Sequence, residues 1–356
     1  MDRPHPDHAG RPSGFVPEGQ ACPPSHRSSA AMTSPVAVII VNYGTADLAI
    51  AGVESVLARH HGGHPVKVHL LDNASPGGDA AAFAQAHAAR GWGDRVRLWP
   101  QTENHGFGRG NNVVIHALLD SPSPPDYVFL LNPDAQLENE AIAILADRLD
   151  ADPQAAAAGA GIAQPDGARV AAAFRFPSAR GEFARALNFG PVSRLFGHHV
   201  ISLPVDQPDG PVDWVSGAAV MMRLSVLRDL GAFDPDFFLY HEEVELMFRM
   251  TKAGHRILYV PAARVQHVEG AATDVRSGAP ERSRRPEYWY ESWRHYHTKT
   301  RGRWGAAATG LAWMAGAALN APLARARGQE LRAPKAFFGD FTRLVLRPLL
   351  RGGPRN

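Results

Sequence analysis

The sequence predicts an α/β protein with a largely parallel sheet, and two observations support this prediction. Short apolar runs alternate with helical patterns from Val36 to Asn132, which is the order expected of parallel strands joined by helices. The chain of 356 residues is also long enough to bury a large core. Its single cysteine, Cys22, excludes disulfides and a cysteine-based zinc site, and it fits a reducing cytoplasm.

The expected elements of the first part follow in a regular order. The strands are VAVIIVNY, VKVHLLD, RVRLW and YVFLLN, and the helices between them run near 47–59, 79–90 and 111–119. In the first helix Ile50, Val53 and Leu57 fall on one face, which indicates a packing stripe. A fourth helix near 138–150 precedes an Ala-rich strand.

The second part has a less regular pattern. Residues 164–211 are expected to be irregular, and VDWVSGAAVMMR predicts a strand broken by glycine. A short helix, an acidic segment, a helix ending at Gly254 and the strand RILYVP follow, and strand patterns stop after His267. Residues 1–34 are polar and Pro-rich, which predicts a disordered leader with Met32 as a candidate start.

Polar side chains gather where four apolar runs end. In an open parallel sheet these positions form one edge, at the carboxyl ends of the strands, where ligands bind. The sequence therefore predicts a cleft there. The residues concerned are Asn42, Tyr43, Asp72, Asn73, Asn104, Asn132 and Asp134.

Two of these strand ends have competing interpretations. Asn132 and Asp134 in LLNPDAQL suit a hard divalent cation bound to a diphosphate, but an Asx-Pro turn explains them as well, and both roles are compatible. Asp72 could accept hydrogen bonds from a ribose or a base, or it could close a turn. His267, at the end of a strand, could add an imidazole to a metal site or be structural.

The run NHGFGRGNN, residues 104–112, places three glycines before a helix. Its glycines alternate and no Lys-Ser/Thr follows, so it matches neither the dinucleotide fingerprint nor the P-loop. A tight turn between strand and helix is favoured over direct phosphate contact.

The segment FDPDFFLYHEEVELMFR combines carboxylates with aromatic side chains. Glu242, Glu243 and Glu245 fall in the first turn of a helix, where the helix dipole favours acids, and Glu245 can pair with Arg249. Partial burial beside aromatic rings would instead raise a carboxyl pKa and suit a general base. Taken alone, the segment leaves both interpretations open.

Taken in order, the motifs resemble the inverting glycosyltransferase family 2, in particular its rhamnosyltransferase-like branch. They are VNYGT, LLDNAS, NHGFGRGNN, LLNPDA, VDWVSGA, FDPDFFLYHEEVEL and YVPAARVQH, and the tail PEYWYESWRHYHTKTRG is also similar to that branch. The resemblance implies a GT-A fold. It assigns a Rossmann-like nucleotide-binding half to 35–135, an acceptor half to 136–270 and a helical, amphipathic region to 271–356.

The resemblance also implies binding roles for residues at the strand ends. The nucleoside would be held by Val41, Asn42, Tyr43, Asp72 and Asn73. Asn132 and Asp134 stand where the family has its Asp-x-Asp motif. Asp134 would then be the principal ligand of Mg²⁺ or Mn²⁺, helped by His267, and Trp214 and Gly217 would line the acceptor side.

Glu242 and Glu243 align with the Glu-Asp pair of the family, in which the Asp is the catalytic base. Glu243 is therefore the expected base, with Glu in place of Asp, and Glu245 likewise replaces an Asp. One extra methylene moves a carboxylate by ~1 Å, enough to change a rate unless the backbone compensates. The implied reaction is an inverting displacement that moves a sugar from dTDP-rhamnose or a UDP-sugar to a glycan or lipid-linked acceptor.

The sequence also bears on two alternative functions. A nucleotide-sugar-binding partner of a polysaccharide assembly complex, without catalysis, is compatible with the Asp-to-Glu changes. A processive synthase would need a Q-x-x-R-W motif, and although Arg303 and Trp304 fit, residue 300 is Thr.

Charge distribution bears on partners and location. The net charge of +2 argues against a nucleic-acid partner. Basic residues crowd the C-terminal third beside an apolar stretch at 304–323, which suits an anionic membrane surface. We expect a helix there that Pro322 ends early, lying on the cytoplasmic face of the membrane near a lipid-linked acceptor rather than spanning the membrane.

Overall fold

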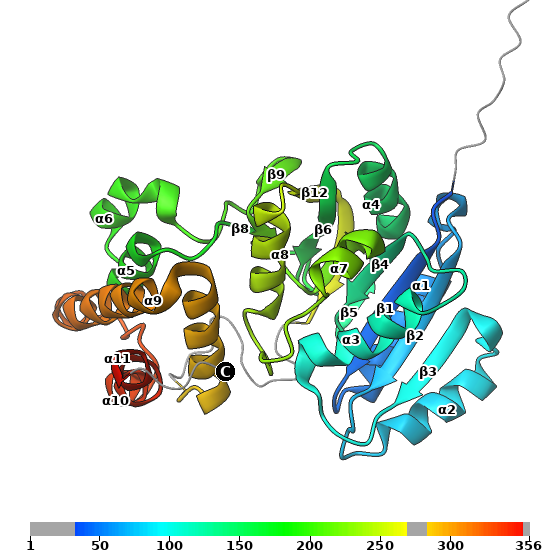
Figure 1. Cartoon of the computed structure of the whole chain (residues 1–356), viewed down its shortest axis with the longest axis horizontal. Coiled ribbons are helices and arrows are strands. Elements are labelled where there is room, and N and C mark those ends of the chain that lie inside the picture. Colours follow the sequence, from blue (N-terminus) through cyan, green and yellow to red (C-terminus); the bar gives the residue numbers. More distant parts are fainter. Residues whose placement is uncertain (1–32, 269–282, 352–356) are drawn as a thin grey trace, which may run out of the picture. The chain divides into compact units, whose positions relative to one another are not determined.

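The computed structural model describes residues 33–268 and 283–351. The expected leader, with Cys22 and Met32, lies outside the described residues except at its last positions. Within these ranges, one sheet contains ten strands in the order β3-β2-β1-β4-β11-β6-β12-β5, with β7 beside β6 and β9 beside β12 (Figure 1). Strands β8 and β10 form a separate pair.

The strand bounds are β1 Val36–Asn42, β2 Val66–Asp72, β3 Val96–Pro100, β4 Tyr127–Leu131, β5 Ala135–Leu137, β6 Ala155–Ala163, β7 Arg169–Val170, β8 Ala173–Phe174, β9 Gly210–Val212, β10 Trp214–Val215, β11 Ala219–Arg223 and β12 Arg256–His267. The helix bounds are α1 Ala46–Leu57, α2 Asp79–Ala89, α3 Gly106–Leu119, α4 Ala141–Asp150, α5 Ala179–Leu187, α6 Gly190–Leu195, α7 Leu224–Leu230, α8 Glu242–Lys252, α9 Glu287–Ala326, α10 Phe337–Phe341 and α11 Arg347–Arg351.

The first part of the sheet is the parallel α/β half that the sequence predicts. Strand β1 pairs in parallel with β2 on one side and β4 on the other, and β2 pairs in parallel with β3. All seven residues of β1 are buried, as expected for a central strand covered on both faces. The strand order reverses between β1 and β4, so their carboxyl ends flank a topological switch point, the usual place for a ligand.

The second part continues the same sheet. Strand β11 pairs antiparallel with β4 and with β6, and β12 runs parallel to β6. The chain returns to the switch point at the end of β12, where His267 lies opposite Ala135 of β5. One continuous sheet therefore connects the two halves.

Two predictions about local structure were wrong. Helix α3 begins at Gly106, about one turn before the expected start, so the glycine run belongs to the helix. The stretch 164–211 is not irregular, because it contains β7, β8, α5 and α6. Helix α5 is capped by Ser178, whose side chain accepts a hydrogen bond from the Gly181 amide at 3.1 Å. The helix packs on α9, a distant contact that local patterns do not reveal.

Helix α9 contains the apolar stretch 304–323 and is longer than expected. It bends at Gly302, which has a φ of 69° (Figure 1). The expectation that Pro322 ends the helix was wrong, since α9 continues to Ala326. Pro322 and Ala318 are both exposed, so water can reach the carbonyl that the proline leaves without a donor. No helix in the part of the chain that the structure describes is long and apolar enough to cross a membrane.

Candidate functional site

A cavity of about 300 Å³ lies at the carboxyl ends of β1 and β4. Its wall includes residues from both halves of the sheet and from the loop before α8. Ten of the residues predicted for the cleft or the site line it: Val41, Tyr43, Asn73, Asn104, Asn132, Asp134, Gly217, Glu242, Glu243 and His267.

Asp134 and His267 meet in this cavity because β5, which begins directly after Asp134, pairs with the end of β12. The His267 Nε2 atom lies 3.0 Å from Asp134 Oδ1 and 3.2 Å from Asn132 Nδ2. Asp134 is almost fully buried, at 6% exposed. A carboxylate, an imidazole and an amide oxygen fit Mn²⁺ or Mg²⁺, and so few protein ligands leave coordination positions for a substrate.

Two larger groups of acids and histidines lie outside the cavity wall. They are His64 with Asp147 and Asp150, and Asp234 with Asp236 and His295. In the second group Lys299 is paired with Asp234, so that group already contains a cation. The pair in the cavity is therefore the better candidate for a metal that acts on a bound substrate.

Three predicted site residues do not line the cavity, because their polar atoms are engaged inside the protein. The Asn42 amide donates to Asp79 at 2.8 Å and to Asp72 at 3.4 Å, and Asp72 also accepts from Ser75 at 2.5 Å. Trp214 donates to the Arg175 carbonyl at 3.0 Å and stacks on Phe174. The buried network around Asn42 joins the ends of β1 and β2 beneath the cavity.

The glycine run makes close contact between α3 and the acidic segment. Gly106 has a φ of +74°, and a Cβ atom there would lie 1.9 Å from the Phe238 carbonyl oxygen. The Phe107 amide donates to the same oxygen at 3.2 Å. Asn73 holds this turn from the other side, since its amide donates to Asn104 Oδ1 at 2.9 Å and its oxygen accepts from the His105 amide. Glycine at 106 is thus required by both backbone conformation and space.

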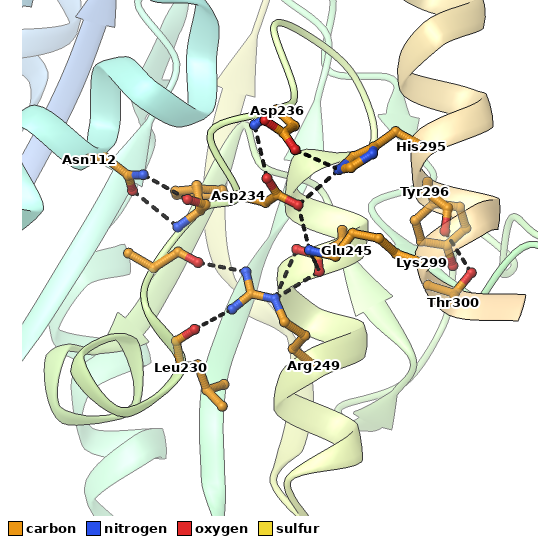
Figure 2. Close-up of polar contacts among 12 residues, drawn as sticks. Asn112, Leu230, Asp234, Asp236, Glu245, Arg249, His295, Tyr296, Lys299 and Thr300 are labelled. Carbon is orange, nitrogen blue, oxygen red and sulfur yellow. Dashed lines mark hydrogen bonds and ion pairs between the residues drawn. The ribbon is translucent and has the colours of Figure 1, made fainter. Parts of the chain in front are cut away.

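Asn112 is a structural residue of the site that the sequence analysis missed. Its amide donates to the Phe233 carbonyl at 2.8 Å, and its oxygen accepts from the Phe233 amide at 3.1 Å (Figure 2). These two bonds attach the start of the acidic segment to α3. The paired asparagines after the glycine run were the available signal, because an amide inside a helix is suited to bonding a neighbouring backbone.

Helix α8 begins at Glu242, and its two first carboxylates face the cavity. Glu242 is 2% exposed, and its Oε2 atom has no hydrogen-bond partner among the described residues. Burial, and then the charge of Glu243, hold the pKa of Glu242 well above its usual range. Burial also raises the pKa of Glu243. Two adjacent carboxylates in such a place favour a shared proton.

Glu245 differs from this pair. It is 1% exposed and binds Arg249 at 2.8 Å, which confirms the predicted pairing within α8. The Arg249 guanidinium also donates to the carbonyls of Leu230 and Ala232, both at 2.6 Å (Figure 2). Glu245 therefore anchors α8 to the turn before the acidic segment, and it does not line the cavity.

The backbone just before the two cavity carboxylates is strained. Tyr240 and His241 both adopt left-handed conformations, with φ of 72° and 70°. Such conformations cost roughly 1–3 kcal/mol each for residues other than glycine, and they persist only where the surroundings enforce them. Burial, and then the charge of Arg185, lower the pKa of His241 to about 4, so its imidazole is neutral near pH 7.

Comparisons with known proteins agree with this geometry. Residues 34–287 match the family model described as Glycosyltransferase like family 2. The chain is 32% identical over 220 residues to N-acetylglucosaminyl-diphospho-decaprenol L-rhamnosyltransferase of Mycobacterium tuberculosis, over 59% of this chain and 68% of that protein. It is 25% identical over 168 residues to Rhamnosyltransferase WbbL of Escherichia coli strain K12, over 46% of this chain and 61% of that protein.

A solved structure shares the fold at low sequence identity. It is the crystal structure of GalNAc-T7 with UDP, GalNAc and Mn²⁺, with a TM-score of 0.50 and 13% identity. The similarity covers 91% of this chain and 59% of the other. It bears on the fold alone.

The buried Glu242 leads to a prediction about stability and pH. Because its pKa is raised in the folded state, the native protein holds a proton that the unfolded chain loses above pH ~4.3, so stability falls as pH rises from there. We expect Glu242→Gln to be more stable than the wild type by more than about 1 kcal/mol at pH 8, with the difference vanishing below pH ~4. Urea unfolding across this range measures it.

The exposed Glu291 of α9 provides the matched control. Glu291→Gln should leave the free energy of unfolding unchanged at every pH. A Glu242→Gln effect that does not vary with pH would show that its carboxyl ionises normally in the folded protein.

Proposed function

The chain belongs to the glycosyltransferase like family 2, and on that premise we propose that it transfers a hexose from a nucleotide-sugar donor to a glycan or lipid-linked acceptor in the cavity at the end of β1 and β4. The family assignment supports an enzyme over a binding protein without catalysis. One observation carries the assignment of the cavity. The cavity brings together Asp134 and His267, the pair proposed to bind a metal, and two carboxylates, Glu242 and Glu243.

The two halves of the sheet divide the work in this proposal. Residues 35–135 bind the nucleotide, with Val41, Tyr43 and Asn73 in the cavity wall. Residues 136–270 bind the acceptor, with Gly217 beside Glu243. Asn42 and Asp72 act from below the wall by joining β1 to β2, and Trp214 supports the acceptor side through its stack on Phe174.

A divalent cation, Mg²⁺ or Mn²⁺, fits the pair formed by Asp134 and His267, with Asn132 beside them. The GalNAc-T7 structure, which shares the fold, contains Mn²⁺ and UDP. Such an ion, when bound, offsets the negative charge that develops on a departing diphosphate.

Glu243 is the general base in the proposed mechanism. Its carboxylate takes the proton of an acceptor hydroxyl while that oxygen bonds to the anomeric carbon, and the bond from this carbon to the diphosphate breaks. The raised pKa of Glu243 suits proton transfer near neutral pH. Glu242, whose pKa is raised further by the neighbouring charge, keeps its proton and so limits the pair to one negative charge.

Gly217 offers room for the longer side chain at the position of the base. A Cβ atom added at Gly217 would lie 3.5 Å from Glu243 Cγ, an ordinary contact distance, so the glycine leaves free space beside the glutamate. This space supports Glu243 in a place where the family pattern has Asp.

The named relatives guide the choice of substrates. Both are described as rhamnosyltransferases, and one name specifies a lipid-linked N-acetylglucosaminyl-diphospho-decaprenol acceptor. We therefore place dTDP-rhamnose first among donors, ahead of UDP-sugars, and a lipid-linked saccharide first among acceptors for cell-surface polysaccharide synthesis.

The second half of α9 supports attachment to the cytoplasmic face of a membrane. Trp304, Leu311 and Leu319 are 69%, 56% and 52% exposed, and their spacing places them near one side of the helix. No acidic residue occurs from 292 to 329, whereas arginines lie at both ends of the apolar stretch. Apolar side chains flanked by cations suit an anionic lipid surface.

The assignment of the base is tested by Glu243→Gln. The amide keeps the size of the side chain but cannot accept the proton, so we expect kcat to fall by about 10²–10⁴-fold. The Kd for dTDP with Mn²⁺ should change less than about threefold, because the nucleotide is assigned to the other half. Transfer from dTDP-rhamnose measures kcat, and calorimetry measures Kd. A variant that folds, binds nucleotide and turns over normally would exclude Glu243 as the base.

The metal assignment is tested by Asp134→Asn, which removes the only carboxylate of the proposed ion site. We expect the affinity for Mn²⁺ in the presence of dTDP to fall by about tenfold or more, since an amide is a weaker ligand than a carboxylate. Asp147→Asn is the control, because Asp147 belongs to an acidic group outside the cavity. If Mn²⁺ binding were lost in Asp147→Asn and kept in Asp134→Asn, the ion would belong to the acidic group outside the cavity, which would contradict the assignment.

Membrane attachment is tested by the double variant Trp304→Ser, Leu311→Ser. We expect its partition into vesicles with anionic lipid to fall by about tenfold, because two buried apolar side chains are lost from the lipid contact. Leu195→Ser in α6 is the control, since Leu195 is 77% exposed outside α9. Equal vesicle binding by the wild type and the double variant would contradict this face as the contact.

A further inference from the structure

One lysine of α9 joins the two ends of the segment that carries Glu243. The Lys299 ammonium lies 2.8 Å from Glu245 Oε1 in the first turn of α8, and it also pairs with Asp234 at the start of the acidic segment (Figure 2). The two carboxylates are buried, with side chains 1% and 11% exposed. A single cation therefore fixes where the segment begins and where α8 starts.

The same face of α9 covers the segment along its length. Tyr288, Ser292, His295 and Lys299 recur at intervals of four, three and four residues, which places them on one side of a helix. The Ser292 hydroxyl donates to the Leu239 carbonyl at 2.9 Å, and His295 Nε2 lies 2.9 Å from Asp234 Oδ2. The Tyr288 ring packs 5.4 Å from that of Phe238 and stacks 6.2 Å from that of Tyr240.

The contacts of Lys299 and His295 outweigh the effect of burial on the charges of Asp234 and Lys299. Burial disfavours the charged form of Asp234, but the hydrogen bonds from His295 and Lys299 outweigh it and hold its pKa below the usual range. Burial likewise opposes the charge on Lys299, and its contacts with Asp234 and Glu245 raise its pKa nonetheless. Asp234 and Lys299 are therefore ionised together across the neutral range, and His295 is hydrogen-bonded to Asp234.

The segment needs such contacts because its backbone does not favour the observed conformation. Tyr240 and His241, the two residues before Glu242, are both left-handed. The α3 side fixes Phe233 and Phe238, whereas Ser292 and Tyr296 of α9 contact the Leu239 carbonyl and the His241 ring. If α9 moved away, the strained turn would be free to relax, and the two cavity carboxylates would move with it.

We propose that Lys299 is a positioning residue for Glu243, and that the first four turns of α9 are part of the active site in this sense. This inference rests on the proposed function, because it presumes that Glu243 is the base. The family match ends at residue 287, where α9 begins, so the match does not include this face. Lys299 touches no substrate in the proposal and acts only through Asp234 and Glu245.

The test compares Lys299→Met with Lys299→Arg in the full chain. Methionine keeps the stem and removes the charge, so we expect kcat for transfer from dTDP-rhamnose to N-acetylglucosaminyl-diphospho-decaprenol to fall by about 10–100-fold, since a misplacement of 1 Å can cost that much. The KM for the donor and the Kd for dTDP should change less than about threefold. Arginine can bridge both carboxylates and should restore kcat to within a few-fold. Amide hydrogen exchange over 234–245 should speed up in Lys299→Met and return in Lys299→Arg.

Lys252→Met is the control, because Lys252 ends α8 and no ion pair of its ammonium is present in the described contacts. It should match the wild type in every measurement. If Lys299→Met does not fold, Ser292→Ala and Thr298→Ala decide instead. Ser292 reaches the segment, whereas Thr298 bonds the Arg294 carbonyl of its own helix. A fall in kcat for Ser292→Ala alone, with the dTDP affinity kept, supports the positioning role.

Three results would overturn the proposal. They are a normal kcat in Lys299→Met, an equal loss of kcat and of dTDP affinity, and a loss of activity that arginine does not rescue. The failure of the proposed function looks different. In that case the wild type itself would transfer no sugar from any nucleotide donor, while the hydrogen-exchange comparison would still report whether Lys299 holds the segment.

Discussion

The contact between Gly106 and the Phe238 carbonyl is the constraint on which the candidate site depends. Gly106 starts α3 in the nucleotide half, and Phe238 belongs to the segment that leads to the two cavity carboxylates. Because no side chain separates them, the segment lies directly on the first turn of the helix. Asn112 and Asn73 hold the same arrangement from either side of that turn. The result is that residues more than a hundred positions apart in the chain form one cavity wall.

This arrangement has an energetic cost, and the cost lies where chemistry is proposed. Glu242 is buried without a partner for one oxygen among the described residues, and two left-handed residues precede it. Each feature would be removed by selection for stability alone. The compensating contacts come from Arg249, which anchors α8, and from the face of α9 that carries Lys299. The surrounding structure is thus a support for two carboxylates that would otherwise relax.

The parallel half and the ligand-binding edge could be predicted because they depend on local patterns. Runs such as VAVIIVN have one periodicity and one end, so the polar residues that follow them meet at the edge of the sheet. The ordered motifs also identified the family. Local patterns could not predict which polar residues at the strand ends face the cavity. Asn42 and Asp72 end their strands and Tyr43 and Asn73 directly follow them, and only the three-dimensional network shows that the first two are turned inward.

Local patterns also could not predict helix α5 or the contacts of helix α9. Helix α5 contains Gly and Arg in a stretch full of turn-forming residues, and it is held by packing on α9 from far along the chain. The basic residues of α9 looked like a surface for lipid, and some are exposed. Lys299, however, turns to two buried carboxylates, and sequence spacing cannot distinguish these roles because each partner is more than fifty residues away.

We propose that one displacement occurs in this cavity, with Glu243 taking the proton of the incoming hydroxyl. The anomeric configuration of the product, determined by NMR after transfer from dTDP-rhamnose with Mn²⁺, tests this proposal. We expect a glycosidic bond of the opposite configuration to that of the donor. A product that keeps the configuration of the donor would require a different mechanism and would contradict the role assigned to Glu243.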